Sequence, residues 1–281
     1  MELKTENLTY KYESNSATPT RAVDGVSFVI PGGEFLGIVG HTGSGKTTLV
    51  QLLDGLLKPS AGTVYLDGED INAKNYSRKK MRAGIGIVFQ YPEYQLFEST
   101  ILKDVCFGPK NQGLKDEEAE KVAVEALKRV GIKEEQFELS PFELSGGQRR
   151  RVAIAGVLAM QPKILILDEP TAGLDPAGRE EMLSLMDELN RDGMTIILIS
   201  HSMEDVAAHA SRIMVLDKGK VFLDGAPAEV FAHVEELENI GLAAPEAYYI
   251  LEEIRKAGLE IETENTVTVE DAVSKIKKSL C

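Results

Sequence analysis

The 281-residue sequence predicts an α/β fold in which a mixed or parallel core sheet is covered by helices on both faces. Short, mostly apolar runs such as KILIL at 163–167 and TIILI at 195–199 are typical of strands buried on both faces. Stretches with helical spacing of apolar residues alternate with these runs along the chain. Glycine-rich or polar residues follow directly after the runs, which is where open α/β sheets bind their ligands.

The first third of the chain contributes mainly strands. We predict these strands over residues 8–12, 22–30, 34–39 and 62–66. Pro31-Gly32-Gly33 forms a turn, and leucines at helical spacing predict a helix over 47–57. The strand over 34–39 therefore leads directly into a glycine-rich loop, which in turn opens that helix.

Strands and helices continue to alternate up to about residue 226. Further strands are predicted over 85–89, 163–167, 195–199, 213–216 and 220–223, the last two as a hairpin. Helices are predicted over 116–130, where Gly131 closes the helix, over 179–190, and within ELSGGQRRRVAIAG at 143–156.

A small C-terminal appendage is predicted beyond the large domain. One amphipathic helix begins at Pro245 and closes at Gly258, and a second runs over 268–280 with Thr268 as its cap. We therefore expect a large domain over 1–227 and an appendage over 228–281, whose candidate role is dimerisation.

The composition excludes several classes of partner. A net charge of −14 argues against non-specific binding to nucleic acid or to anionic lipid, because both favour a basic protein. The first ten residues lack a signal-peptide pattern, and the apolar run over 152–160 is far shorter than the roughly 20 residues that span a bilayer. The two cysteines, Cys106 and Cys281, form no disulfide framework, which favours a reducing compartment. We expect any work at a membrane to require a partner protein.

Residues 40–47, GHTGSGKT, fit the phosphate-binding pattern G-x-x-x-x-G-K-[ST] between a strand and a helix. The glycines let the backbone wrap the phosphates, Lys46 reaches the β- and γ-phosphate oxygens, and the Thr47 hydroxyl ligates Mg²⁺. The expected nucleotide-binding residues of this segment are Gly40, His41, Thr42, Gly43, Ser44, Gly45, Lys46, Thr47 and Thr48. The alternative, a glycine-rich turn with a stray lysine, is disfavoured by the strand and helix on either side.

Asp168 and Glu169 directly follow a buried strand, where they could merely end the strand or lie in a solvated turn. Because a phosphate loop is expected at the same sheet edge, we predict that Asp168 holds Mg²⁺ through water. Glu169 is the predicted general base toward the attacking water. Two carboxylates beside an ATP phosphate require the metal to offset their charge.

Three further side chains are candidates for the same site because of where they lie along the chain. His201 is either an ordinary surface histidine or a γ-phosphate contact, and its place after a strand favours the contact. Gln90 alone gives only weak evidence for a site. It becomes a candidate metal or water contact because the phosphate loop and the two carboxylates are expected at the same sheet edge. Tyr12 either packs on a sheet or stacks on a purine base. The catalytic candidates are thus Glu169, His201, Lys46 and Gln90, and the metal candidates are Thr47, Gln90 and Asp168.

A second phosphate-binding pattern lies far downstream, where Ser145-Gly146-Gly147-Gln148 opens a helix. Arg149-Arg150-Arg151 follow, and such a run is usually a solvated helix face. Positive charges in a first helical turn oppose the helix dipole, a cost that a nearby carboxylate or phosphate would offset. The sequence therefore raises the question of why one chain carries two phosphate-binding sites.

The motifs together resemble those of ABC-type ATPases over roughly residues 1–227. They are GHTGSGKT, Gln90, LSGGQ at 144–148, ILILDE at 164–169, Gly173-Leu174-Asp175 and His201. The resemblance implies an N-terminal antiparallel β subdomain, a helical signature subdomain over about 91–160, and a small C-terminal α(+β) appendage. It also implies that Ser145, Gly146, Gly147 and Gln148 close over ATP held by a second subunit. Asp175 would couple the two sites, and Tyr12 would stack on adenine.

A narrower resemblance is to the ATP-binding subunits of energy-coupling factor (ECF) transporters, of the CbiO/EcfA type. It is carried by QYPEYQLFE at 90–98, Phe107-Gly108-Pro109 and SPFELSGGQRRRVAIAGVLAM at 140–160. It implies an ATP-hydrolysing subunit that pairs head-to-tail, with a copy or a paralogue, around two ATP and drives uptake of a vitamin or a transition-metal ion.

The same resemblance implies a place at the membrane. The subunit would dock on a transmembrane T component through Pro92–Phe97, work with the substrate-binding S component indirectly, and lie at the cytoplasmic face. The alternative for residues 92–97 is a buried loop. Two other functions remain open: a soluble ABC ATPase without a membrane partner, and a purely structural binding module, against which the intact Glu169 and His201 argue.

Overall fold

A six-stranded sheet forms the centre of the computed structural model, which describes residues 1–12, 21–263 and 266–280. The strand order is β10-β9-β3-β8-β7-β6, and all neighbours are parallel except β10, which runs antiparallel to β9. The bounds are β3 Phe35–Val39, β6 Ile85–Val88, β7 Ile164–Asp168, β8 Thr195–Ile199, β9 Arg212–Asp217 and β10 Lys220–Gly225. The predicted mixed core sheet is therefore confirmed.

The central strands are buried on both faces, as their apolar sequences predict. Successive side chains of β7 alternate between two cores: Leu165 and Leu167 face one, and Ile164 and Ile166 face the other. Strand β8 alternates in the same way. Every residue of β3, β7 and β8 is buried, so these strands contribute packing along their length and can offer reactive groups only at their ends.

An antiparallel sheet covers one of these cores, confirming the predicted N-terminal β subdomain. Its order is β2-β1-β4-β5, with β1 over Leu3–Lys11, β2 over Arg21–Ile30, β4 over Ala61–Leu66 and β5 over Glu69–Asp70. Helix α1 (Lys46–Leu53) lies in the same core, where its leucines meet side chains of both sheets.

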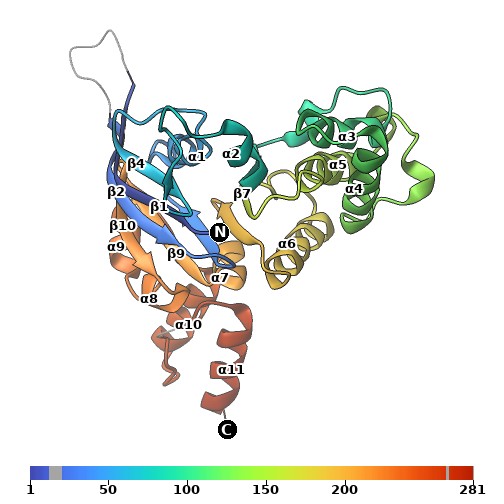
Figure 1. Cartoon of the computed structure of the whole chain (residues 1–281). Helices are drawn as coiled ribbons and strands as arrows, with labels where there is room; N and C mark the ends of the chain where they lie inside the picture. The colour runs from blue at the N-terminus through green and yellow to red at the C-terminus, as the bar shows by residue number, and fades with distance from the viewer. Residues whose placement is uncertain (13–20, 264–265, 281) are drawn as a thin grey trace.

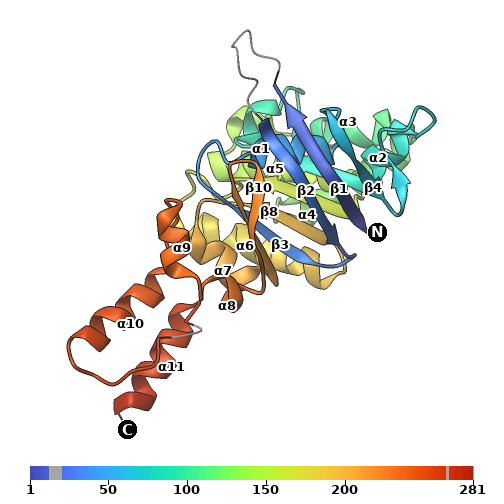
Figure 2. The ribbon, with the colours of Figure 1, turned by 90° about the vertical axis from the view of Figure 1, so that its left-hand side faces the viewer.

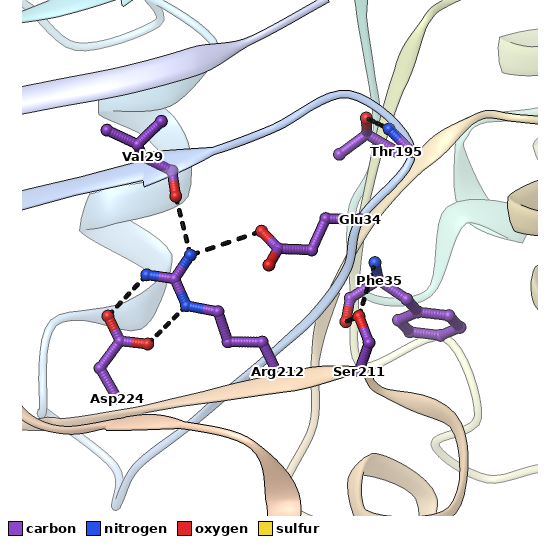
Figure 3. Close-up of polar contacts among 8 residues, drawn as sticks. Val29, Glu34, Phe35, Thr195, Ser211, Arg212 and Asp224 are labelled. Atoms are coloured by element: carbon purple, nitrogen blue, oxygen red, sulfur yellow. Dashed lines mark hydrogen bonds and ion pairs between the residues drawn. The ribbon is translucent and has the colours of Figure 1, made fainter.

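Arg212 of β9 ties the two sheets together (Figure 3). Its guanidinium donates to the Val29 carbonyl of β2 at 2.8 Å and pairs with Asp224 of β10 at 2.6 Å and with Glu34 at 3.4 Å. Burial raises the pKa of Glu34, and the nearby arginine opposes that rise. The contact fixes the start of β3, and hence the loop that follows this strand, against the antiparallel sheet.

A helical region packs on the other core (Figure 1). It comprises α3 (Ile101–Asn111), α4 (Asp116–Arg129) and α5 (Gly146–Leu158), with short 3₁₀ turns η1 (Pro92–Gln95), η2 (Glu134–Gln136) and η3 (Pro141–Glu143). Helices α6 (Pro176–Arg191) and α7 (Met203–His209) pack in the same core, whereas α2 (Arg78–Gly84) precedes β6. The predicted helical signature subdomain is therefore present.

All regular elements in the described part of the C-terminal segment are helices. It contains α8 (Pro227–Val230), α9 (Val234–Asn239), α10 (Glu246–Lys256) and α11 (Val269–Leu280), so the α(+β) appendage lacks a described strand. Helices α10 and α11 extend away from the sheets (Figure 2). They share a small core of Ala247, Leu251, Ile261 and Ala272. Val230 and Leu237, in contrast, belong to the large core, and the domain boundary at residue 227 stays a prediction.

Several element bounds differ from the sequence-based expectation. Strand β1 begins at Leu3 rather than Leu8, and α1 ends at Leu53 rather than Leu57 because the chain turns at Gly55, whose φ is +64°. Helices α2, α3 and α7 were not predicted. Of the two cysteines, Cys106 is buried in α3, and Cys281 lies outside the described residues.

We expect the substitution Leu251→Ala to loosen α10 and α11 without harming the rest of the chain. Leu251 is fully buried in the small C-terminal core, and removing such a side chain costs about 2–5 kcal/mol. Limited proteolysis should then cut the variant near this helix pair, while ATP hydrolysis survives.

The neighbouring Ile250→Ala is the matched control, because Ile250 is 50% exposed. If Leu251→Ala and Ile250→Ala are equally resistant to protease, the two helices do not depend on this separate core.

Candidate functional site

The glycine-rich loop joins β3 to α1 in a conformation that only glycine adopts easily. Gly45 caps the helix with φ of +106°, and a Cβ atom there would lie 2.1 Å from the Ala22 carbonyl oxygen. The Lys46 side chain is buried and curls back over the loop, donating to the carbonyls of Gly40 at 2.5 Å and His41 at 3.2 Å. The loop's own carbonyls thus hold the Lys46 side chain over the loop.

Two contacts hold this loop against the end of β9. His41 Nε2 lies 2.8 Å from Asp217 Oδ1, and the Gly219 amide donates to the Ser44 carbonyl at 2.9 Å. The Ser44 hydroxyl is buried without a hydrogen-bond partner among the described residues. A buried polar atom of this kind is costly unless a ligand or water satisfies it, which favours an anion in the loop.

The predicted carboxylates lie at the carboxyl end of β7. Asp168 is the last residue of the strand, opposite Ile199 of β8, and the Glu169 amide donates to the Ile199 carbonyl at 2.9 Å. Glu169 has a left-handed backbone with φ of +53°, which is uncommon for a residue other than glycine. Its Oε1 atom is buried and lies 3.5 Å from His201 Nε2.

Lys46, Asp168, Glu169 and His201 influence one another electrostatically. Burial raises the pKa of Glu169 to about 7; the charge of Asp168 adds to this rise, and Lys46 opposes it. Burial also raises the pKa of Asp168, again against Lys46. Burial lowers the pKa of Lys46, an effect that the two carboxylates oppose, and burial together with Lys46 lowers the pKa of His201. The structure therefore brings these four predicted residues together.

The other predicted residues of this edge lie around that cluster. Tyr12 follows β1; its hydroxyl lies 3.2 Å from Thr48 Oγ1, and its half-exposed ring meets Tyr10 edge-on. Thr47 is exposed at the start of α1. Gln90 is exposed two residues beyond β6, which is the strand beside β7. Tyr12 thus lies against α1, Thr47 lies at the start of that helix, and Gln90 lies beyond the strand next to β7.

The second phosphate-binding pattern is not brought to the first within the chain. Ser145 caps α5 by accepting from the Gln148 amide at 3.3 Å, and the Gln148 side chain accepts from the Ser145 amide at 3.1 Å. Helix α5 lies with α3 and α4, away from α1 (Figure 1). Ser145 and Gly146 are exposed, so this helix start is free to meet an anion that another molecule holds.

Arg150 corrects the expectation of a solvated arginine face. Its side chain is 3% exposed and forms a forked ion pair with Glu93 of η1, at 3.1 Å and 2.8 Å. Nη1 also donates to the carbonyls of Pro170 and Ala172, at 3.1 Å and 2.6 Å. Arg150 lies just beyond the first turn of α5, and a carboxylate from a distant segment offsets its charge near the positive end of the helix dipole. Arg151 pairs instead with Glu181 of α6.

A second network, which the sequence did not indicate, supports the turn after His201. Asp205 is buried and accepts from Arg179 Nε at 2.8 Å and from the Thr171 hydroxyl at 3.2 Å. Arg179 Nη2 also donates to the Ser202 hydroxyl at 2.6 Å. Asp175 meanwhile caps α6 by accepting from the Gly178 amide at 2.7 Å. These contacts join the segment after Glu169 to the segment after His201.

The residues proposed for the metal suit Mg²⁺. Thr47, Gln90 and Asp168 offer hydroxyl, amide and carboxylate oxygens, and Mg²⁺ usually takes few protein ligands beside substrate phosphates and water. Within residues 1–12, 21–263 and 266–280, no group of three or more His, Cys, Asp or Glu side chains is arranged to hold a metal ion.

An apolar groove opens on the helical region. It has a volume of 520 Å³ and lies between α2, η1, α3 and α5. The apolar side chains Leu96, Phe97, Phe107 and Met160 line it, and Lys79 and Arg82 of α2 lie at its wall. Phe97 and Phe107 meet edge-on with centroids 5.0 Å apart and are 59% and 46% exposed, whereas Leu96 is 8% exposed. No described helix is both long enough and apolar enough to cross a bilayer.

Comparison with known proteins gives consistent results. The family model of ABC transporters matches residues 23–172. The energy-coupling factor transporter ATP-binding protein EcfA2 of Clostridium tetani is 51% identical over 280 residues, which cover 99% of this chain and 97% of that protein. The corresponding protein of Caldanaerobacter subterraneus is also 51% identical, over 100% of this chain and 98% of its own.

Two solved structures share the fold. CbiO1 from Clostridium perfringens, described as part of the ABC transporter complex CbiONQ, is 43% identical with a TM-score of 0.74, over 89% of this chain and 98% of its own. The ATP-binding cassette MJ0796, solved as a dimer in a post-hydrolysis state with ADP and Pi, is 33% identical with a TM-score of 0.71. That match covers 80% of this chain and 98% of the cassette.

We expect Glu169→Gln to stabilise the nucleotide-free protein at alkaline pH. The folded protein keeps the Glu169 proton up to about pH 7, whereas the unfolded chain loses it near pH 4.5. The ionised side chain thus destabilises the fold progressively between these values, by at most about 3 kcal/mol above pH 7. The melting temperature of the variant in EDTA should exceed that of the wild type at pH 8.5, with the gap closing toward pH 5.

Glu180→Gln, at an exposed position of α6, serves as the control and should show no such gap. A gap for Glu169→Gln that is the same at both pH values would contradict the raised pKa.

Proposed function

The chain belongs to the ABC transporter ATPases, as an ATP-binding subunit of the energy-coupling factor type, and on that premise we propose how its residues use ATP. The observation that carries the proposal is the separation of two phosphate-binding sites on one chain. The loop at 40–47 adjoins two carboxylates and a histidine, whereas the start of α5 lies away from it (Figure 1). Each ATP is therefore enclosed by the loop of one subunit and the α5 start of another.

In this proposal, hydrolysis takes place where β3, β7 and β8 end. Lys46 and the loop amides bind the β- and γ-phosphates, and the buried Ser44 hydroxyl finds its partner there. Glu169 accepts a proton from water as the water oxygen bonds to the γ-phosphorus and the bond to the β–γ bridging oxygen breaks. His201, 3.5 Å from Glu169, contacts the γ-phosphate. Mg²⁺, held by Thr47, Asp168 and Gln90, would neutralise charge on the phosphates.

The exposed residues at the start of α5 suggest how two subunits would pair. Ser145 and the first amides of α5 would bind the γ-phosphate of ATP on the facing subunit, a group that hydrolysis releases. Asp175 would couple the two ATP sites, and the Tyr12 ring would stack on adenine. The dimeric MJ0796 cassette with ADP and Pi supports this arrangement. Because ATP joins the subunits and its hydrolysis separates them, a chemical step becomes an opening motion.

The membrane partner would bind the groove between η1, α3 and α5. Phe97 and Phe107 present apolar rings there, which suits a helix of a transmembrane T component. CbiO1, described as part of the CbiONQ complex, supports such an assembly. The subunit would thereby lie at the cytoplasmic face and drive uptake of a vitamin or transition-metal ion that a separate S component binds.

We expect Glu169→Gln to lower ATP hydrolysis by about a hundredfold or more, the usual contribution of a general base. The variant should still bind ATP, and its ATP-bound dimer should persist longer in size-exclusion chromatography. Hydrolysis at the wild-type rate would remove Glu169 from its proposed role. Glu180→Gln is again the control.

Phe97→Glu should uncouple the ATPase from its membrane partner. A charge in the apolar groove opposes burial of a partner helix, so co-purification with the T component and uptake into proteoliposomes should be lost. ATP hydrolysis by the isolated subunit should persist, because Phe97 lies outside the nucleotide site.

Leu56→Glu is a matched control, since Leu56 is 58% exposed but does not line the groove. If Phe97→Glu still binds the T component, the docking surface lies elsewhere, or the protein works without a membrane partner.

A further inference from the structure

Arg150 is the point where three functional segments meet. Its guanidinium uses three nitrogens: Nε and Nη2 bind the Glu93 carboxylate, and Nη1 binds the carbonyls of Pro170 and Ala172. The Tyr91 ring lies 5.8 Å from the guanidinium carbon. One buried side chain of α5 thus contacts the proposed docking segment and the turn between Glu169 and Asp175.

The chemistry of arginine makes this link stiff. The guanidinium is planar and always charged, and its donors are fixed in a fork that a lysine cannot reproduce. Burial alone would raise the pKa of Glu93, but hydrogen bonds from Arg150 and a backbone amide, with the nearby positive charge, hold that pKa below its usual range. Glu93 is therefore a charged partner, and separating it from Arg150 would leave two buried charges unpaired.

Because Arg150 joins η1 to two other segments, a small movement of η1 should be passed on to them. Glu93 is one residue from Tyr94, which is 82% exposed, and four from Phe97 in the groove. On the other side, the Pro170 carbonyl follows Glu169 directly, and Ala172 lies three residues before Asp175. Helix α5 itself carries Ser145 at its start. A shift of η1 therefore moves the Glu169–Asp175 turn and α5 together, as long as the fork holds.

We propose that Arg150 is a positioning residue that transmits docking of the membrane partner at residues 91–97 to the turn over 169–175. The inference rests on the docking surface proposed above. The hydrogen-bond partners of Arg150 are Glu93 and the carbonyls of Pro170 and Ala172, so we expect it to act through the segments it binds. Glu93 is the other half of the link.

Hydrogen exchange of the full-length protein, free and bound to the T component in lipid nanodiscs, tests this link. In the wild type, binding should slow exchange at least about threefold both in peptides covering 91–97 and in peptides covering 170–175. Arg150→Lys keeps the charge and loses the fork, so it should retain the slowing at 91–97 and lose most of it at 170–175.

Arg151→Lys is the matched control and should behave as the wild type, because Arg151 pairs with the more exposed Glu181. Glu93→Gln provides a second route if Arg150→Lys is too unstable, and it should show the same selective loss. The double variant should lose no more than either single variant, because both remove one interaction.

The possible outcomes distinguish the proposed Arg150 link from the proposed docking surface. Slowing at 170–175 that persists in Arg150→Lys or Glu93→Gln overturns the link, as does a wild type that responds at 91–97 alone. A wild type that does not respond at 91–97 removes the docking surface and the link together.

Discussion

Strands buried on both faces leave no side-chain position for a ligand, and this constraint places the chemistry of the protein at one edge of its sheet. Every residue of β7 and β8 is buried, so the first groups free to react come where the strands end. Glu169 and His201 are such residues, and the loop after β3 opens at the same edge. The apolar character of the strands is thus the reason that the polar residues converge.

The groups that meet at this edge include buried charges and a buried hydroxyl without full compensation from neighbouring side chains. Two carboxylates with raised pKa values adjoin a buried lysine whose pKa is lowered, and a buried serine hydroxyl has no described partner. In the proposed function, phosphate would satisfy the lysine and the hydroxyl, and a divalent cation would offset the charge of the carboxylates. The exposed start of α5 offers hydrogen-bond donors that could bind an anion. The proposed pairing of two cassettes across ATP would bring both sets of groups to the same phosphates.

The sequence predicted what depends on local pattern. The uniform apolar run of β8 was predicted with its observed bounds, and α4 closes at Gly131 as expected. Strand β1 of the antiparallel sheet was predicted too short because exposed side chains interrupt its apolar pattern. In the site, the phosphate loop and strand-end carboxylates follow from motifs and position. The Arg150–Glu93 pair could not be predicted, because it joins residues 57 apart and only tertiary packing brings them together.

The left-handed backbone of Glu169 has a consequence for how the family changes over time. A non-glycine residue with positive φ costs roughly 1 kcal/mol, and burying its carboxylate adds to that cost. Selection for folding alone would favour glycine or asparagine at this position, so we attribute the glutamate to its proposed role in turnover. If a duplicated cassette no longer needed to hydrolyse ATP, we would expect it to lose this side chain early. The loss would raise the free energy of unfolding of that cassette.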